Sequence, residues 1–236
     1  MGSAQVVESN EHSVKNVVKF LPATLPFNSV SFEYERMLNP KNALTLQIGF
    51  PRQQSVIGKY GITGNSDVKT AEFGTTILRA AYRHYTGKKR LPKGFYIEPY
   101  LKYQHIKGDA TIEGVDDQDI PYAGSSEIKL NTINMGCQFG VQFLIAKRVS
   151  LDLYFLGLEG GILSGHVDTT PTSSNTAYDP IILSVIKGVI EQKIADLPSS
   201  IGKRLTVTQT QSQVNVKASS TPYPWIRGGF SIGFAF

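Results

Sequence analysis

A serine and a histidine lie two residues apart in Ser164-Gly165-His166 of this 236-residue chain. On a strand, residues two apart point to the same side, so a hydroxyl and an imidazole would share one face here. Such a pair is a first requirement of nucleophilic catalysis, in which a base activates the hydroxyl. Strand parity places both side chains on the polar face. The alternative, which we favour, is two polar residues at the entrance of a loop that follows Gly160-Gly161.

Other catalytic constellations are missing from the sequence. No carboxylate pair of the glycosidase type and no metal-ligand spacing stands out, and Cys137 is the only cysteine, which excludes an intrachain disulfide. We therefore expect neither enzyme activity nor a metal or other cofactor. The net charge is +5, but the basic residues cluster in particular turns instead of forming a stripe, which argues against nucleic-acid binding.

Charged residues also recur at alternate positions within otherwise apolar segments, where they would share one face. Because burying an unpaired charge is costly, we expect these mixed charges to pair in a closed interior polar network. A narrow passage for small solutes or ions is the alternative. The nine residues of this predicted network are Lys19, Glu33, Glu35, Arg79, Arg83, Glu98, Lys102, Asp152 and Arg227.

The segments that must position these residues alternate between apolar and polar side chains. In 225–236 the even positions are mostly large and apolar, and the odd positions are mostly small or polar. An alternation with period two predicts a strand between two different environments. About eight strands are expected in this way, at 14–21, 30–35, 44–50, 78–83, 97–104, 133–143, 149–155 and 225–236.

The connections between these strands alternate in length. Those at 37–42, 86–94 and 144–148 are short, those at 51–70, 108–128 and 164–221 are long, and only 23–28 breaks the pattern. Short turns at one end and long loops at the other are typical of transmembrane β-barrels, whose strands need no long apolar run. We predict an all-β fold, a transmembrane antiparallel up-and-down β-barrel of about eight strands with both termini at the periplasmic end.

A soluble, lipocalin-like barrel would show the same alternation with its apolar face inside. Three features favour the membrane. The polar face is rich in Gly, Ser and Gln, as a narrow filled interior requires; loop lengths segregate by end; and the chain ends on an aromatic residue within a strand. An eight-stranded barrel is only wide enough for its own side chains.

The pattern resembles the small eight-stranded outer-membrane barrels of the OmpX and OmpA-transmembrane-domain class. More closely, it is similar to outer-membrane barrel families without an assigned activity that share a Tyr-Glu-Arg strand ending and a Gly-Phe-Tyr-x-x-Pro strand start. In this chain these motifs are Tyr34-Glu35-Arg36 and Gly94-Phe95-Tyr96-Ile97-Glu98-Pro99. The last eight residues resemble the signal read by the barrel assembly machinery, with Phe230, Ile232, Phe234 and Phe236 as its apolar positions. The resemblance implies the fold and the outer membrane of a Gram-negative bacterium, and it implies no particular activity.

The longest loop contains a predicted helix at 179–197. Asp179 is a suitable N-cap, Pro180 a favourable first residue, and Pro198 ends the helix. We expect its apolar face to pack on the barrel mouth or neighbouring loops, with the outer-leaflet interface or a protein partner as alternatives. That face comprises Ile182, Val185, Ile186, Val189, Ile190, Ile194 and Leu197.

These expectations give a simple organisation. Residues 1–13 are expected to be an expression leader and a periplasmic N-terminal segment that follows signal cleavage, and 14–236 a single barrel domain with an insertion at 164–221. We expect a non-enzymatic barrel whose structural or interaction role lies in its extracellular loops; a membrane-embedded lipid-modifying enzyme, such as a lipid A acylase or deacylase, or a narrow pore, are the alternatives. Expected partners are outer-membrane lipids and lipopolysaccharide, the assembly machinery during biogenesis, and a protein bound by the loops.

Overall fold

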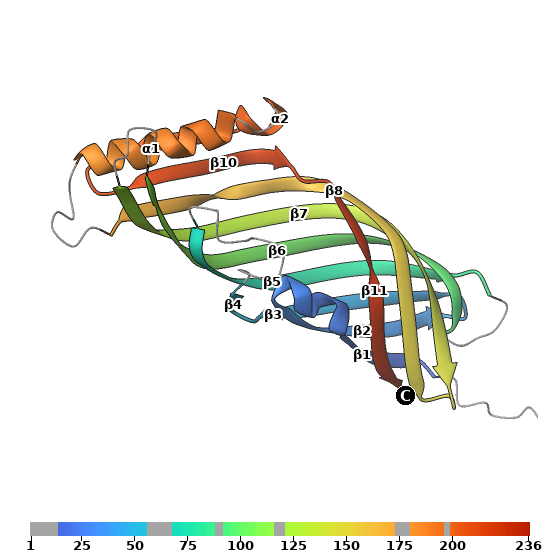
Figure 1. Cartoon of the computed structure of the whole chain (residues 1–236). Coiled ribbons are helices and arrows are strands. Elements are labelled where there is room, and N and C mark those ends of the chain that lie inside the picture. The colour runs from blue at the N-terminus through green and yellow to red at the C-terminus, as the bar shows by residue number, and fades with distance from the viewer. Residues whose placement is uncertain (1–13, 56–67, 88–91, 116–120, 173–179, 196–198) are drawn as a thin grey trace, which may run out of the picture.

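The computed structural model describes residues 14–55, 68–87, 92–115, 121–172, 180–195 and 199–236 (Figure 1). Its elements are β1 (Asn16–Leu21), the 3-10 helix η1 (Pro22–Phe27), β2 (Ser29–Asn39), β3 (Asn42–Pro51), β4 (Gln54–Ser55), β5 (Val68–Tyr85), β6 (Gly94–Val115), β7 (Pro121–Ile145), β8 (Val149–Pro171), α1 (Pro180–Ala195), α2 (Ser199–Gly202), β9 (Leu205–Gln209), β10 (Val214–Pro222) and β11 (Trp225–Ala235).

Eight of these strands close a ring in which every neighbouring pair is antiparallel. The order is β1, β2, β3, β5, β6, β7, β8 and β11, and β11 returns to pair with β1. β4 adds two residues to β5, and β10 and β9 continue the sheet along the far part of β8. The structure thus confirms the predicted all-β class, the antiparallel order and the eight strands.

Apart from one bulge in β8, side chains of the ring strands alternate between the inside and the outside of the ring. On β2, for example, Ser31, Glu33 and Glu35 are buried, whereas Phe32 and Tyr34 are exposed. Each strand is therefore polar inside and apolar outside over most of its length. The apolar positions of the expected assembly signal, Phe230, Ile232, Phe234 and Phe236, all lie on the outer face.

Two of the short connections, those between β2 and β3 and between β7 and β8, form tight turns at one end of the ring. Between β2 and β3, the Asn39 side chain accepts hydrogen bonds from the backbone N–H groups of Lys41 and Asn42, each at 3.0 Å. Between β7 and β8, Ala146 and Lys147 both have positive φ (50° and 59°), as in a type I′ hairpin turn. Asn16 and Phe236 exchange backbone hydrogen bonds of 2.9 Å at this same end, which we call the turn end.

The other end differs from the sequence prediction, because the strands run far into the expected loops. β6 and β7 extend through most of 108–128, and β8 continues to Pro171. The expected loop 164–221 contributes β9 and β10 to the sheet. Polar residues occupy these extensions on their outer face, so the apolar pattern that marks the ring strands stops before the strands do. Figure 1 shows the extended sheet projecting beyond β2 and β3. We call residues 105–115, 121–131, 164–171, 180–195 and 199–222 the distal lobe.

A β-bulge in β8 changes which residues face inward. Phe139 and Cys137 on β7 pair with Phe155 and Leu158 on β8, so β8 contains one extra residue, and Leu156 has a positive φ of 50°. The same shift appears opposite β11, between Arg227 and Gly229. The inward positions of β8 are consequently even before the bulge and odd after it.

Helix α1 packs against strands β7, β9 and β10 within the distal lobe. Its residues Leu183 and Ile186 are buried in a cluster with Tyr122 of β7 and Val214 of β10, while four further apolar residues of α1 lie against it. The predicted face was too narrow, because Leu183, which it did not include, is one of the two most buried residues of the helix. The helix is described from Pro180 to Ala195, so Asp179 and Leu197 lie outside the described residues, and Ile194 is half-buried. None of the helices described is long and apolar enough to cross a membrane.

Replacing both Leu183 and Ile186 with aspartate is expected to release α1 from the sheet without unfolding the ring. Each side chain loses a burial worth about 1.5–3 kcal/mol. The cluster lies in the distal lobe, where Tyr122 of β7 and Val214 of β10 are its strand members, and contains none of the ring's interior charges. Limited proteolysis should then cut the double variant within 180–195 much faster than the wild type. Ile181→Asp is the matched control, because Ile181 lies on the same helix with its side chain exposed. Equal cutting of the wild type and the double variant would show that α1 does not pack on its own sheet.

Candidate functional site

The inside of the ring is filled by charged and polar side chains. Among the described residues it contains five cations and five carboxylates, most of them almost completely buried. The cations are Lys19, Arg79, Arg83, Lys102 and Arg227, and the carboxylates are Glu33, Glu35, Glu98, Asp152 and Glu159. The formal charge of this interior is therefore zero, which is what a buried set of ionised groups requires.

Seven of these residues form one connected cluster in the half of the ring nearer the turn end. The ammonium of Lys19 lies 2.7 Å from Glu35, 2.9 Å from Asp152 and 3.1 Å from Glu33. Arg79 bridges Glu33 and Glu98. Each cation thus contacts at least two carboxylates from different strands, so the cluster ties together strands on opposite sides of the ring.

Arg83 is the centre of this cluster. Its guanidinium contacts Asp152 at 2.8 Å, pairs with Glu98, and lies within 3.5 Å of both remaining carboxylates. The side-chain carbonyl of Gln142 accepts hydrogen bonds from Arg83 at 2.6 Å and from Lys19 at 2.8 Å. The Arg83 guanidinium also lies 3.9 Å from the ring centre of Tyr96. Almost every donor of this arginine is therefore engaged, which fixes its position.

Tyrosines complete the cluster, and glycines of β7 make room for them. Tyr85 donates a hydrogen bond to Glu35 at 2.5 Å and Tyr96 donates one to Asp152 at 2.7 Å. A side chain at Gly140 would collide with the Tyr96 ring, because an added Cβ would lie 2.3 Å from it. On the side of the cluster that faces the turn end, the rings of Tyr85 and Tyr96 pack with Met37 and Ala43 in a small buried core. This core closes the turn end of the ring.

A second layer of charges lies next to this cluster, on the side away from the turn end. Lys102 pairs with Glu159, and Tyr100 donates a hydrogen bond to the same carboxylate at 3.0 Å. Arg227 donates a hydrogen bond to Gln47 at 3.2 Å and stacks on Tyr154, with 4.8 Å between the guanidinium and the ring centre. Gln47 also accepts a hydrogen bond from Arg79, so it links the two layers.

The structure brings eight of the nine predicted network residues into ion pairs with one another or with Glu159. Arg227 differs, since no carboxylate within salt-bridge distance of it is found among the described residues. Sequence reasoning missed Glu159, because the bulge at Leu156 reverses the parity of β8. Two signals were present: Phe155 and Leu156 are consecutive apolar residues, and Glu159 is a charge in the apolar register.

Ser164 and His166 lie after the bulge and therefore on the outer face, not on the inner polar face that was predicted. Their side chains share a side of the strand but are not hydrogen-bonded to each other, because residues two apart on a strand are separated by roughly 7 Å. His84 and His105 are also on the outer face, each hydrogen-bonded to an asparagine. His12 lies outside the described residues.

The charged groups of this interior pair with one another. Within the described chain no histidine reaches the charged interior, and no group of three His, Cys, Asp or Glu side chains is arranged to hold a metal ion. Among the described residues, each of its five carboxylates is held by at least one cation, and each of its cations except Arg227 is held by a carboxylate. Comparisons of the chain with protein-family models, with curated proteins and with solved structures find no match.

Proposed function

We propose that the protein is an eight-stranded transmembrane β-barrel of the outer membrane, closed to solutes by its ion pairs, whose distal lobe carries a non-enzymatic interaction role. The observation that carries this proposal is the inversion of polarity. Five cations and five carboxylates lie inside the ring, while Leu46, Met135 and Ile226 are each about 60–70% exposed outside it. In water, so large an apolar outer surface would be very unfavourable.

The outer apolar surface also has a sharp upper boundary, as a membrane protein requires. Tyr103, Ile133 and Ile162 form the last apolar row across β6, β7 and β8. Beyond this row all outward residues of the next three rows are polar. Lys107 of β6 pairs with Glu127 of β7, and within single strands Lys129 lies near Glu127 and His166 near Asp168. These rows are His105, Asn131 and Ser164; then Lys107, Lys129 and His166; then Asp109, Glu127 and Asp168. The boundary supports a hydrocarbon layer that ends near Tyr103, with the distal lobe in water.

The alternatives receive less support. A pore needs a continuous passage through the ring. The ion pairs of Arg83 cross the interior from β5 to β2, β6 and β8, where such a passage would run. A lipid-modifying enzyme needs a histidine beside a nucleophile, and the described histidines lie on the outer face. The distal lobe, by contrast, is a folded sheet and helix well beyond the ring, which is the kind of surface that binds other molecules.

Purified protein folded in detergent is expected to migrate differently on a denaturing gel before and after boiling. A closed barrel resists the gel detergent until it is heated, because its hydrogen bonds form a ring without free edges. The same sample incubated in concentrated urea before loading is the control, and it should migrate like the boiled protein. Identical migration of the boiled and the unboiled folded samples would contradict the barrel.

Planar bilayer recordings test the closed interior. Because the ion pairs fill the ring, we expect no stable conductance from heat-modifiable protein. A stable, ion-selective conductance shown by the intact protein would contradict the closed interior and favour the narrow pore.

A further inference from the structure

The wall of the ring is incomplete beside the upper part of β11. This strand pairs with β8 from Trp225 to Phe234, but with β1 only from Ile232 to Ala235. Above that level the chain leaves β1 and forms η1, where Pro22 and Pro26 have no N–H group to donate to a neighbouring strand. The edge of β11 from Trp225 to Gly229 therefore faces η1 instead of a strand.

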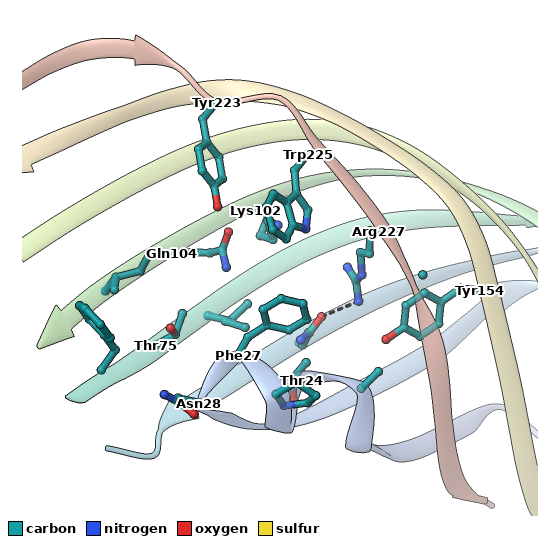
Figure 2. A pocket seen from close by; sticks show the side chains of 17 residues that line it. Thr24, Phe27, Asn28, Thr75, Lys102, Gln104, Tyr154, Tyr223, Trp225 and Arg227 are labelled. Atoms are coloured by element: carbon teal, nitrogen blue, oxygen red, sulfur yellow. Dashed lines mark hydrogen bonds between the residues drawn. The ribbon is translucent and has the colours of Figure 1, made fainter. Parts of the chain in front are cut away.

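Behind this gap is a cavity of about 250 Å³. In Figure 2, Phe27 and Trp225 lie between Gln104 on the left and Arg227 on the right, and these four residues and Lys102 line the cavity. Trp225 stacks on Tyr223 and meets Phe27 edge-on, with ring centres 5.9 Å and 6.0 Å apart. Phe27 and Trp225 are both about half exposed, so these two rings form its mouth.

Arg227 is the one interior cation for which the described residues provide no carboxylate. Gln47 holds one of its terminal nitrogens, and the other, Nη1, is buried without a hydrogen-bond partner among the described residues. A desolvated guanidinium with an unused donor is unfavourable unless a further acceptor binds it. Arg227 lines the cavity, so an acceptor bound there reaches this nitrogen after a small shift of the side chain. Lys102, a second cation, lies in the same wall.

The mouth of the cavity lies at the level of the outer apolar surface. Ile226, next to Trp225, points outward and pairs with Leu158, and both side chains are strongly exposed. A molecule entering here would come from the hydrocarbon layer, if the proposed membrane location holds. The end of this molecule inside the cavity would contact the guanidinium of Arg227. The end at the mouth would contact the aromatic rings and lipid.

We propose that this cavity binds a free single-chain fatty acid, with its carboxylate at Arg227 and its chain passing alongside the paired rings of Phe27 and Trp225. The volume supports one chain, since sites for larger ligands are typically about 300–1,000 Å³. A carboxylate also matches the charge, because it supplies the acceptor that Arg227 lacks and can be bidentate. The inference rests on the proposed membrane location and adds a ligand to it.

Trp225 is the only tryptophan, so its fluorescence reports on the mouth directly. The protein is placed in nanodiscs of saturated phosphatidylcholine and titrated with a bromine-substituted decanoate, whose bromine quenches indole fluorescence on contact. We expect saturable quenching that unlabelled decanoate reverses. The methyl ester of the same probe has the chain without the charge, and it should quench without saturation.

Arg227→Gln tests the carboxylate contact, and Arg148→Gln in the exposed β7–β8 turn is the matched control. Loss of a charge-assisted hydrogen bond should weaken saturable quenching at least about tenfold in the first variant and leave it unchanged in the second. Quenching that rises linearly and equally for acid, ester and Arg227→Gln would overturn the fatty-acid site. Heat-modifiable protein in the nanodisc would in that case still support the barrel, whereas failure to enter nanodiscs would overturn the barrel itself.

A second variant covers the case in which Arg227→Gln does not fold. Gln104→Phe fills the cavity from β6 and leaves both cations in place. It is expected to abolish saturable quenching while the protein remains heat-modifiable. Undiminished saturable quenching in this variant would show that the probe binds elsewhere.

Discussion

Arg83→Met is expected to lower the free energy of unfolding by about 3–5 kcal/mol, because it removes the cation at the centre of a buried ion cluster. Methionine keeps much of the side-chain length, so the loss arises mainly from charge. Glu33, Glu35, Glu98 and Asp152 would remain with only Lys19 and Arg79 to neutralise them. The measurement is urea-dependent folding into phospholipid vesicles, followed by the gel mobility of folded protein.

Two further variants separate charge pairing from general damage. Arg148→Met removes an exposed arginine of the β7–β8 turn and should change stability by no more than about 0.5 kcal/mol. Combining Arg83→Met with Glu98→Met removes one charge of each sign, so the double variant should lose less than the sum of the two single changes. Additive losses, or an Arg83→Met no worse than Arg148→Met, would contradict a cooperative ion-pair plug.

Much of the ring was readable from the sequence because its strands face two contrasting environments. Glu33 and Glu35 alternate with Phe32 and Tyr34, and this contrast identifies both the strand and its inward side. The charges that such parity places inside one narrow ring must pair. Which residues pair was not readable, since Lys19 meets Asp152 through ring closure and strand register, which leave no local sequence signal.

The errors all arise where the alternation changes character. The bulge at Leu156 shifts β8 by one residue, which turned Ser164 and His166 outward and concealed Glu159. Beyond Tyr103 the strands continue with polar residues outside, so they look like loops when apolar periodicity is the criterion. The short pairing of β1 with β11, and with it the cavity at Arg227, depends on where η1 interrupts the ring. The prolines at 22 and 26 indicate that β1 ends there, but they do not indicate that the edge of β11 lies opposite the segment that follows.

Strand β6 gives the most direct test of where the membrane lies, because its outer face crosses the proposed boundary. Leu101 and Val115 are apolar, exposed to similar degrees, and on the same face of the same strand. Leu101 lies within the apolar outer surface, whereas Val115 lies beyond the charged rows. Fourteen residues of strand separate them, roughly 46 Å along β6, which exceeds the height of the apolar band of a transmembrane barrel, about 25 Å.

Leu101→Arg is expected to destabilise the protein in bilayers by more than about 1 kcal/mol, because the cost of a cation rises from about 0–1 kcal/mol at the interface towards about 2–4 kcal/mol at the midplane; Val115→Arg, in water, is expected to cost about 0–1 kcal/mol. The two substitutions make the same change of charge at exposed apolar positions, so a soluble protein would tolerate both within about 0.5 kcal/mol. Urea-dependent folding into phospholipid vesicles measures the difference. If both variants fold as well as the wild type, the outer apolar surface does not face lipid. Equal large losses would instead show that the hydrocarbon layer extends over the distal lobe, contrary to the charged rows that begin at His105.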